Sequence, residues 1–188
     1  MLKPILVTIS SALFAWFCCF FYLIAISKSS FSYDSIYRVK SHLVFDKEFS
    51  GKAKVLDGDS IKVGNKEVRL FGLDAPEYKQ KCLDKDNLEY NCGINSRDFL
   101  QKLIAGKKVR CTYASKDKYD RFLGICYLEK LSINAEIIKN GMAVIYNFTE
   151  SSEEMNALEN QAKASKIGIW QGSFELPKDY RKSNPRLN

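Results

Sequence analysis

The chain has 188 residues, of which 46% are hydrophobic and 27% charged, and its formal net charge is +7 at pH 7. This length allows one globular domain with a hydrophobic core and an additional segment. The basic excess favours polyanionic partners such as nucleic acids, with a solvated basic surface as the alternative. The only histidine, His42, precedes the predicted domain, so histidine-dependent triads and histidine metal sites are excluded in it.

An uncharged apolar run occupies residues 5–26. It is long enough to cross a bilayer as a helix, and the preceding Lys3 resembles the first part of a signal sequence. Residues 1–27 are therefore predicted to be a membrane anchor or a cleaved signal, and residues 28–46 a tether. The membrane is one predicted partner. The domain is expected outside the cytoplasm, held at the membrane in the periplasm or at the cell surface, or secreted if the signal is removed.

Four cysteines lie in the predicted domain and permit three pairings: Cys82, Cys92, Cys111 and Cys126. Cys111 and Cys126 fall in two strand-like runs where a cross-strand bridge is feasible, and a Cys82–Cys92 bridge would close one loop. We predict these two disulfides, each contributing about 3 kcal/mol by loop entropy, and they favour an oxidising compartment. Four reduced thiols are the alternative. A zinc site is disfavoured because no Cys-x-x-Cys pair is present.

Alternating hydrophobicity after Phe49 predicts a meander of three strands at residues 52–56, 60–63 and 67–73. Turn-forming sequences separate these segments. Pro76 cannot continue a strand ladder, so Asp74 and Glu77 are placed at a strand end and on the loop that follows it. Functional groups are commonly presented at such positions by a rigid scaffold.

Two further strands are predicted at residues 108–113 and 122–128. Helices are predicted at residues 95–105, at 133–140, and from a capping box at Ser151 to about Lys166. The fold class is therefore α+β, mainly β: a five-stranded OB-type Greek-key barrel with about three helices, preceded by one N-terminal hydrophobic helix. The domain is placed at residues 47–175 and a loose basic tail at 176–188. A monomer is expected because no heptad seam is present.

Acidic side chains are concentrated in residues 51–77, where Asp57, Asp59, Asp74 and Glu77 surround Arg69. Crowded carboxylates repel one another unless they share a cation, and hard oxygen ligands suit Ca²⁺ or Mg²⁺. The planar fork of an arginine matches a phosphate. Together these groups indicate phosphodiester chemistry. The alternatives are turn chemistry for the acids and a cross-strand salt bridge for Arg69.

Four sequence blocks occur in a specific order: VLDGDS at 55–60, VRLFGLDAPE at 68–77, DKYDR at 117–121 and GIW at 168–170. In this order and spacing they resemble the thermonuclease (micrococcal nuclease-like) family. The resemblance extends from about Phe49 to Gly172. It implies an OB-type barrel with helices that hydrolyses phosphodiester bonds of DNA and RNA with Ca²⁺.

The resemblance also implies roles for individual residues. The implied calcium ligands are the side chains of Asp59 and Asp74, the backbone carbonyl of Ala75 and a water held by Glu77. Arg69 and Arg121 are implied to grip the phosphate and form the catalytic set together with Glu77. Fixed positive groups stabilise the charge that develops in the transition state. Glu77 either accepts a proton from the attacking water or positions it.

Two tyrosines and one acid complete the candidate site. Tyr119 and Tyr146 are candidates for stacking on or hydrogen bonding to a nucleotide, with packing as the alternative. Asp120 stands where the family usually has a glycine before the second arginine. It adds a negative charge next to Arg121 and restricts the backbone.

We therefore expect a calcium-dependent endonuclease. The alternative is a non-catalytic OB module that binds nucleic acid or protein and has a vestigial metal site. Inactive relatives usually lose one of the two arginines or the glutamate, and this chain retains Arg69, Glu77 and Arg121.

Overall fold

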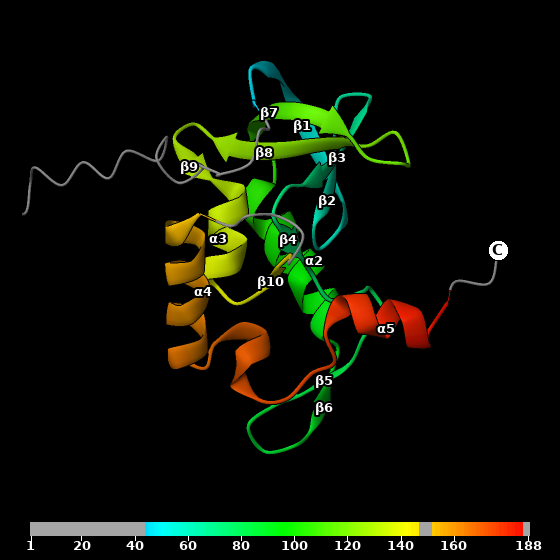
Figure 1. Cartoon of the computed structure of the whole chain (residues 1–188), viewed down its shortest axis with the longest axis vertical. Helices are drawn as coiled ribbons and strands as arrows, with labels where there is room; N and C mark the ends of the chain where they lie inside the picture. Colours follow the sequence, from blue (N-terminus) through cyan, green and yellow to red (C-terminus); the bar gives the residue numbers. More distant parts are fainter. Residues whose placement is uncertain (1–43, 147–151, 186–188) are drawn as a thin grey trace, which may run out of the picture. The chain divides into compact units, whose positions relative to one another are not determined.

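Five strands form a closed barrel in the structure, a computed structural model that describes residues 44–146 and 152–185 (Figure 1). The strands are β1 (Lys47–Asp57), β2 (Ser60–Val63), β3 (Lys66–Leu70), β7 (Lys108–Lys116) and β8 (Phe122–Leu128). Neighbours pair in the order β3-β2-β1-β7-β8, and a parallel pairing of β3 with β8 closes the ring. The predicted five-stranded barrel is confirmed, and it is consistent with the OB type.

Alternate side chains of the strands fill the barrel interior, as the two-residue period of a β-strand requires. The side chains that are at most 3% exposed include Val55, Ile61, Val63, Val68, Leu70 and Val109. Burying a side chain of this kind stabilises a fold by about 1.5–3 kcal/mol relative to leaving it exposed. The barrel thus provides a rigid support for the polar groups at its strand ends.

Helices follow the third and fifth barrel strands, which confirms the mixed α+β composition. In the described ranges they are α2 (Cys92–Ile104), α3 (Ile133–Lys139), α4 (Glu153–Ala164), the 3-10 helix η2 (Gly168–Gln171) and α5 (Pro177–Ser183). The chain leaves α2 through Gly106 and α3 through Gly141, with φ of 69° and 64°. Glycine adopts this left-handed conformation without the steric cost of a side chain.

Two predictions about the C-terminal third of the chain were wrong. The N-cap of α4 is Ser152 and not Ser151, because the Ser152 hydroxyl accepts a hydrogen bond from the backbone N–H of Met155 at 3.2 Å; Ser151 itself lies outside the described residues. The tail expected to be loose contains α5. Pro177 occupies the first turn of α5 and basic residues occupy its last turn, an arrangement that favours a helix.

Short strand pairs and two disulfides complete the fold. Strand β4 (Leu73–Asp74) pairs with β10 (Val144–Ile145), β5 (Cys82–Leu83) pairs with β6 (Glu89–Tyr90), and β9 (Leu131–Ser132) extends the sheet beside β8. The structure contains both predicted cystine bridges, Cys82–Cys92 and Cys111–Cys126. Cys111 and Cys126 are directly opposite each other in the register of β7 and β8.

Residues 1–43 lie outside the described part of the chain, together with the predicted anchor or signal at 1–27 and most of the tether at 28–46. Among the helices within residues 44–146 and 152–185, none is long and apolar enough to cross a membrane.

Candidate active site

The turn between β1 and β2 packs directly against the segment that carries Asp74. Gly58, in the centre of this turn, has no room for a side chain: a Cβ atom there would lie 2.8 Å from Cβ of Ala75 and 3.0 Å from Cβ of Ser96. The close approach lets the backbone N–H of Ala75 donate a hydrogen bond to Oδ2 of Asp59 at 3.0 Å. Asp59 in this turn and Asp74 at the end of β4 are therefore brought to one place.

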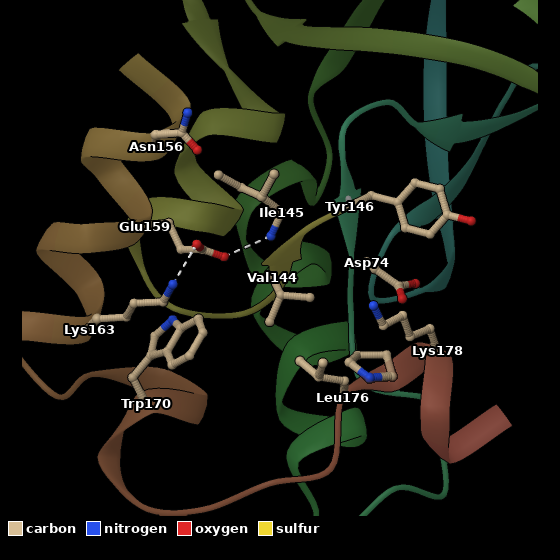
Figure 2. A pocket seen from close by; sticks show the side chains of 11 residues that line it. Asp74, Val144, Ile145, Tyr146, Asn156, Glu159, Lys163, Trp170, Leu176 and Lys178 are labelled. Carbon is tan, nitrogen blue, oxygen red and sulfur yellow. Dashed lines mark hydrogen bonds and ion pairs between the residues drawn. The ribbon is translucent and has the colours of Figure 1, made fainter. Parts of the chain in front are cut away.

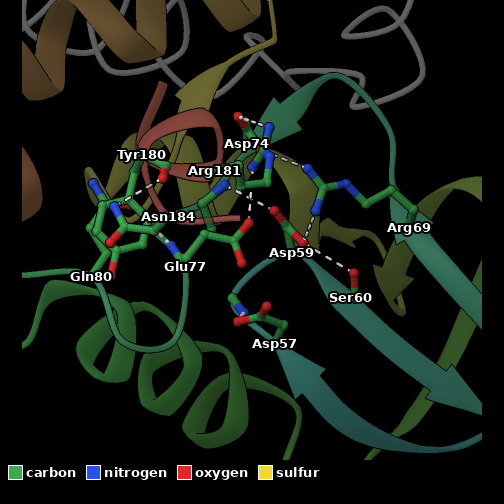
Figure 3. Close-up of polar contacts among 12 residues, drawn as sticks. Asp57, Asp59, Ser60, Arg69, Asp74, Glu77, Gln80, Tyr180, Arg181 and Asn184 are labelled. Carbon is green, nitrogen blue, oxygen red and sulfur yellow. Dashed lines mark hydrogen bonds and ion pairs between the residues drawn. The ribbon is translucent and has the colours of Figure 1, made fainter. Parts of the chain in front are cut away.

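Arg69 connects these two carboxylates. Its Nη1 pairs with Oδ1 of Asp59, and its Nη2 donates to Oδ1 of Asp74 at 2.7 Å (Figure 3). The Asp59 and Asp74 side chains are only 4% and 2% exposed, so each needs a positive partner to remain ionised. The salt bridge considered as an alternative for Arg69 is present, and its partners are the candidate metal ligands themselves.

Burial is the largest single influence on the pKa of both Asp59 and Arg69, but it decides the direction of the shift only for Asp59. It raises the pKa of Asp59, while the Arg69 guanidinium and the Ala75 N–H oppose that rise. Burial lowers the pKa of Arg69, but the charges of Asp59 and Asp74 outweigh it, and the net pKa is above the ordinary value. The guanidinium is therefore always charged here.

Asp57 has a different environment from Asp59, its neighbour across Gly58. Its Oδ1 accepts a hydrogen bond from the Gly58 N–H at 2.8 Å, as in a turn-forming aspartate. Burial, followed by the charge of Asp59, raises the pKa of Asp57 to about 6. The hydrogen bond to Gly58 makes Asp57 a turn residue next to the acidic site.

Glu77 is positioned by the loop after β4. The backbone carbonyl of Glu77 lies where a side chain at Gly93, in the first turn of α2, would have to be. The Glu77 N–H donates to Oε1 of Gln80 at 3.1 Å, and the Gln80 N–H donates to the Glu77 carbonyl at 2.7 Å. Gln80 is fully buried. Sequence reasoning missed Gln80, because nothing distinguishes it from the other polar residues of a charged loop.

Arg181 of α5 is the second arginine at this acidic site, and sequence reasoning missed it too. Its Nη1 donates to Oδ1 of Asp74 at 2.9 Å and to Oε1 of Glu77 at 3.0 Å, and its Nη2 donates to Oδ2 of Asp74 at 3.0 Å (Figure 3). Both charge interactions raise the pKa of Arg181 above its ordinary value, against the lowering effect of burial. The helix signals around Pro177 were visible in the sequence, but the contact with Asp74 was not.

Arg121 reaches the barrel just before β8. In the parallel register Arg69 is opposite Leu123, and Arg121 is two residues before Leu123. Arg121 therefore lies just before the start of the strand that neighbours the one carrying Arg69. The Arg121 side chain donates from Nε at 2.8 Å to Oδ2 of Asp117 and pairs with the same oxygen through Nη2 at 2.7 Å.

Asp120 adopts a left-handed backbone conformation, with φ of 66°, which glycine adopts without steric cost. Its carboxylate is 84% exposed and pairs with Nζ of Lys116 at 2.8 Å. The expectation that Asp120 puts its charge beside the Arg121 guanidinium needs correction, because the acid in contact with that guanidinium is Asp117.

The two candidate tyrosines have different environments. Tyr119 is 68% exposed, and the guanidinium carbon of Arg121 lies 5.4 Å from the centre of its ring. Tyr146 lines a cavity of about 380 Å³ that also has Asp74 in its wall. Figure 2 shows Asp74 on one side of this cavity and Glu159, Lys163 and Trp170 on the other. Tyr119 is the better placed of the two to stack on a base.

The oxygen atoms of the acidic site suit a hard cation such as Ca²⁺. They are the carboxylates of Asp59, Asp74 and Glu77, and the carbonyl of Ala75 is next to Asp74. In the conformation described, these carboxylates are engaged by Arg69 and Arg181. Within the described residues, no three His, Cys, Asp or Glu side chains are arranged as a metal cluster. The donor atoms are of the type that Ca²⁺ prefers, while the described conformation pairs them with Arg69 and Arg181 instead of arranging three of them around one ion position.

Comparison with known proteins identifies the family. The family model described as staphylococcal nuclease homologue matches residues 67–172, which is more than half of the chain. This chain belongs to the staphylococcal nuclease homologue family. The matched region contains Arg69, Asp74, Glu77 and Arg121, and Arg181 lies beyond it.

Several curated proteins are similar to the chain. The succinoglycan biosynthesis protein ExoI of Rhizobium meliloti is 35% identical over 127 residues, which cover 66% of each of the two chains. An uncharacterized endonuclease of Haemophilus influenzae is 33% identical over 159 residues, covering 81% of this chain and 83% of that protein. A probable staphylococcal-like nuclease of Oryza sativa is 33% identical over 125 residues, covering 66% of this chain and 30% of that protein. Family membership and the names of the endonuclease and the staphylococcal-like nuclease support a hydrolase that acts on nucleic acids.

Proposed function

We propose that the chain is a calcium-dependent endonuclease that hydrolyses phosphodiester bonds of DNA, RNA or both. The observation that carries this proposal is one charged network at an end of the barrel, in which Arg69 links the carboxylates of Asp59 and Asp74 and Arg181 links Asp74 to Glu77. Holding several largely buried carboxylates together costs desolvation free energy, and such clusters are commonly found at functional sites. Membership in a nuclease family supports the same conclusion.

The division of labour follows from the chemistry of phosphodiester hydrolysis. Negative charge grows on the non-bridging oxygens and on the leaving oxygen, so Arg69 and Arg121 stabilise the transition state more than the ground state. Glu77 positions the attacking water or accepts its proton. A bound Ca²⁺ would polarise and orient the phosphate. Tyr119, exposed beside Arg121, provides a face on which a base can stack.

We also propose that this activity lies outside the cytoplasm. The two cystine bridges support an oxidising compartment, because cytosolic thiols are kept reduced. The apolar run at residues 5–26 supports either membrane attachment or export by a cleaved signal. The mass of the protein purified from its own cells, before and after alkylation of free thiols, tests this: four alkylated thiols in residues 44–188 would contradict it.

The activity is tested with circular single-stranded DNA, which has no ends, and with a matched linear RNA. The full-length protein is incubated with each substrate, either with Ca²⁺ or with a calcium-specific chelator. We expect cleavage of both circles and linear strands that depends on Ca²⁺. Cleavage that persists in the chelator would contradict the mechanism. If the protein binds a nuclease-resistant phosphorothioate strand but cleaves neither of the two ordinary substrates, the non-catalytic binding module is favoured instead.

A further inference from the structure

Arg181 forms a bidentate pair with one acid and a single hydrogen bond with another. Both of its terminal nitrogens donate to Asp74, at 2.9 and 3.0 Å, and one of them also donates to Glu77 at 3.0 Å. A planar guanidinium fork matched to a carboxylate is the strongest form of such pairing. Arg181 thus fills the position of a shared cation between two acids that would otherwise repel each other.

The oxygens that Arg181 occupies are those the proposed cation needs. Oδ1 of Asp74 already accepts from Arg69 at 2.7 Å, so Arg181 completes the hydrogen bonding of that carboxylate. Calcium ligands lie at about 2.3–2.6 Å from the ion. A cation at that distance from Asp74 and Glu77 would be in direct contact with the Arg181 guanidinium and repelled by it. The two positive groups therefore exclude each other.

The segment that carries Arg181 is weakly packed at its far end. We call residues 175–184 the C-terminal strap. Its start is anchored, because Pro177 is buried and the side-chain amide of Gln80 donates to the Glu175 carbonyl at 2.6 Å. Pro177 is the one residue of α5 that is buried, and the Arg181 side chain is 35% exposed. Residues 178–181 are half-buried and residues 182–184 are exposed, so this end is packed less than the start, and Arg181 ties it to Asp74 and Glu77.

We propose that the C-terminal strap is an autoinhibitory device in which Arg181 acts as an internal counter-cation. Arg181 and the divalent cation compete for Asp74 and Glu77, so metal binding requires the strap to swing away from the site. This inference rests on the proposed calcium-dependent function. The strap lowers the apparent affinity for the cation, because only the fraction of molecules with Arg181 withdrawn can bind it.

Calcium affinity tests the strap directly. The full-length wild-type protein, Arg181→Gln and a control, Lys182→Gln, are freed of metal and titrated with Ca²⁺ in a calorimeter. Lys182 is on the same helix, 76% exposed and paired with Asp179, so its loss changes the net charge equally without touching the acidic site. We expect Arg181→Gln to bind Ca²⁺ at least fivefold more tightly than the wild type, and Lys182→Gln to match the wild type within twofold.

Hydrogen exchange provides a second readout that does not depend on catalysis. In the wild type, saturating Ca²⁺ should accelerate amide exchange in residues 178–184, and in Arg181→Gln the exchange there should be fast without Ca²⁺. Slower amide exchange of the strap in Ca²⁺, or equal Ca²⁺ affinities of wild type and Arg181→Gln, would contradict the autoinhibitory role of the strap and leave the proposed calcium-dependent function in place. Failure of both proteins to bind Ca²⁺ would overturn the proposed metal and the strap with it. Unchanged affinity with reduced cleavage would assign Arg181 to the substrate and reject autoinhibition.

Discussion

The carboxylate of Asp117 orients the guanidinium of Arg121: its Oδ2 accepts a hydrogen bond from Nε at 2.8 Å and forms an ion pair with Nη2 at 2.7 Å. The other oxygen of Asp117 accepts the backbone N–H groups of Tyr119 and Arg121, at 2.9 and 3.0 Å. One acid therefore organises the loop and orients the arginine that the loop presents. These hydrogen bonds lower the pKa of Asp117, against the raising effect of its burial.

Removing the guanidinium of Arg121 should impair catalysis far more than stability. Arg121→Ala is expected to lower kcat by about 10²–10³-fold, by analogy with the loss of one donor to a developing oxyanion. Asp117→Ala is expected to cost less than this, because the guanidinium remains and only its orientation is lost. Steady-state cleavage of a fluorogenic oligonucleotide measures both effects. Lys130→Ala removes a positive charge from an exposed residue and serves as the control; its kcat should stay near that of the wild type.

Arg69 should be essential for stability as well as for activity. Arg69→Met leaves the nearly inaccessible carboxylates of Asp59 and Asp74 short of a positive partner, which is expected to cost about 3–5 kcal/mol in the free energy of unfolding. Arg110→Met breaks a surface pair with Glu48 in which both side chains are more than 40% exposed. That control should cost under about 1 kcal/mol. Urea unfolding in chelator compares the two; equal losses would show that the Arg69 pairs are not buried in solution.

Asp57 should make the stability of the metal-free protein depend on pH. Its pKa is 3.8 in an ordinary environment and about 6 in the folded protein. The folded state therefore holds this proton more tightly, and the stability it contributes is fully present below pH 4 and lost as the pH rises through 6. The causes are burial, followed by the charges of Asp59 and Glu77, against the Gly58 N–H and Arg69.

Asp57→Asn removes this titration while keeping an oxygen that can accept from Gly58. At pH 7 in chelator the variant should be more stable than the wild type by about 1–2 kcal/mol, a value reduced from the full shift because Asp57 is partly exposed. Below pH 4 the difference should vanish. Thermal unfolding between pH 3.5 and 8 provides the measurement, and a gain that is constant across this range would assign the effect to something other than ionisation.

Asp120 should tolerate glycine better than alanine. At φ of 66° an L-residue pays a steric cost that glycine avoids, and alanine lacks the side-chain hydrogen bonding that lets aspartate visit this region. Asp120→Gly is expected to be more stable than Asp120→Ala by about 1 kcal/mol. Lys118 serves as the control, because it is not among the described residues with positive φ. There Lys118→Ala should be more stable than Lys118→Gly. The same order at both positions would contradict the left-handed conformation of Asp120.

Local chemistry explains how much of the fold could be predicted. The bounds of β8, residues 122–128, agree with the prediction because a short, continuous apolar run between polar turns depends only on neighbours in sequence. Gly106 and Gly141 ended their helices for the same reason. Asp59 lies in the turn between β1 and β2, and Arg69 lies on β3 directly opposite Ser60 of β2, so the geometry of the meander alone brings these two residues close.

The partners of the site residues were decided by the tertiary structure. Arg181 is 107 residues from Asp74, and their contact exists only because the chain returns past the buried Gln80, which binds the Glu175 carbonyl. Asp117 rather than Asp120 meets the Arg121 guanidinium because the positive φ of Asp120 directs its carboxylate toward Lys116. The sequence by itself determined the barrel, its helix stops and the acids of the site, since these follow from short-range periodicity and turn chemistry. Which cation those acids meet depends on long-range packing, where no local preference of the chain decides the outcome.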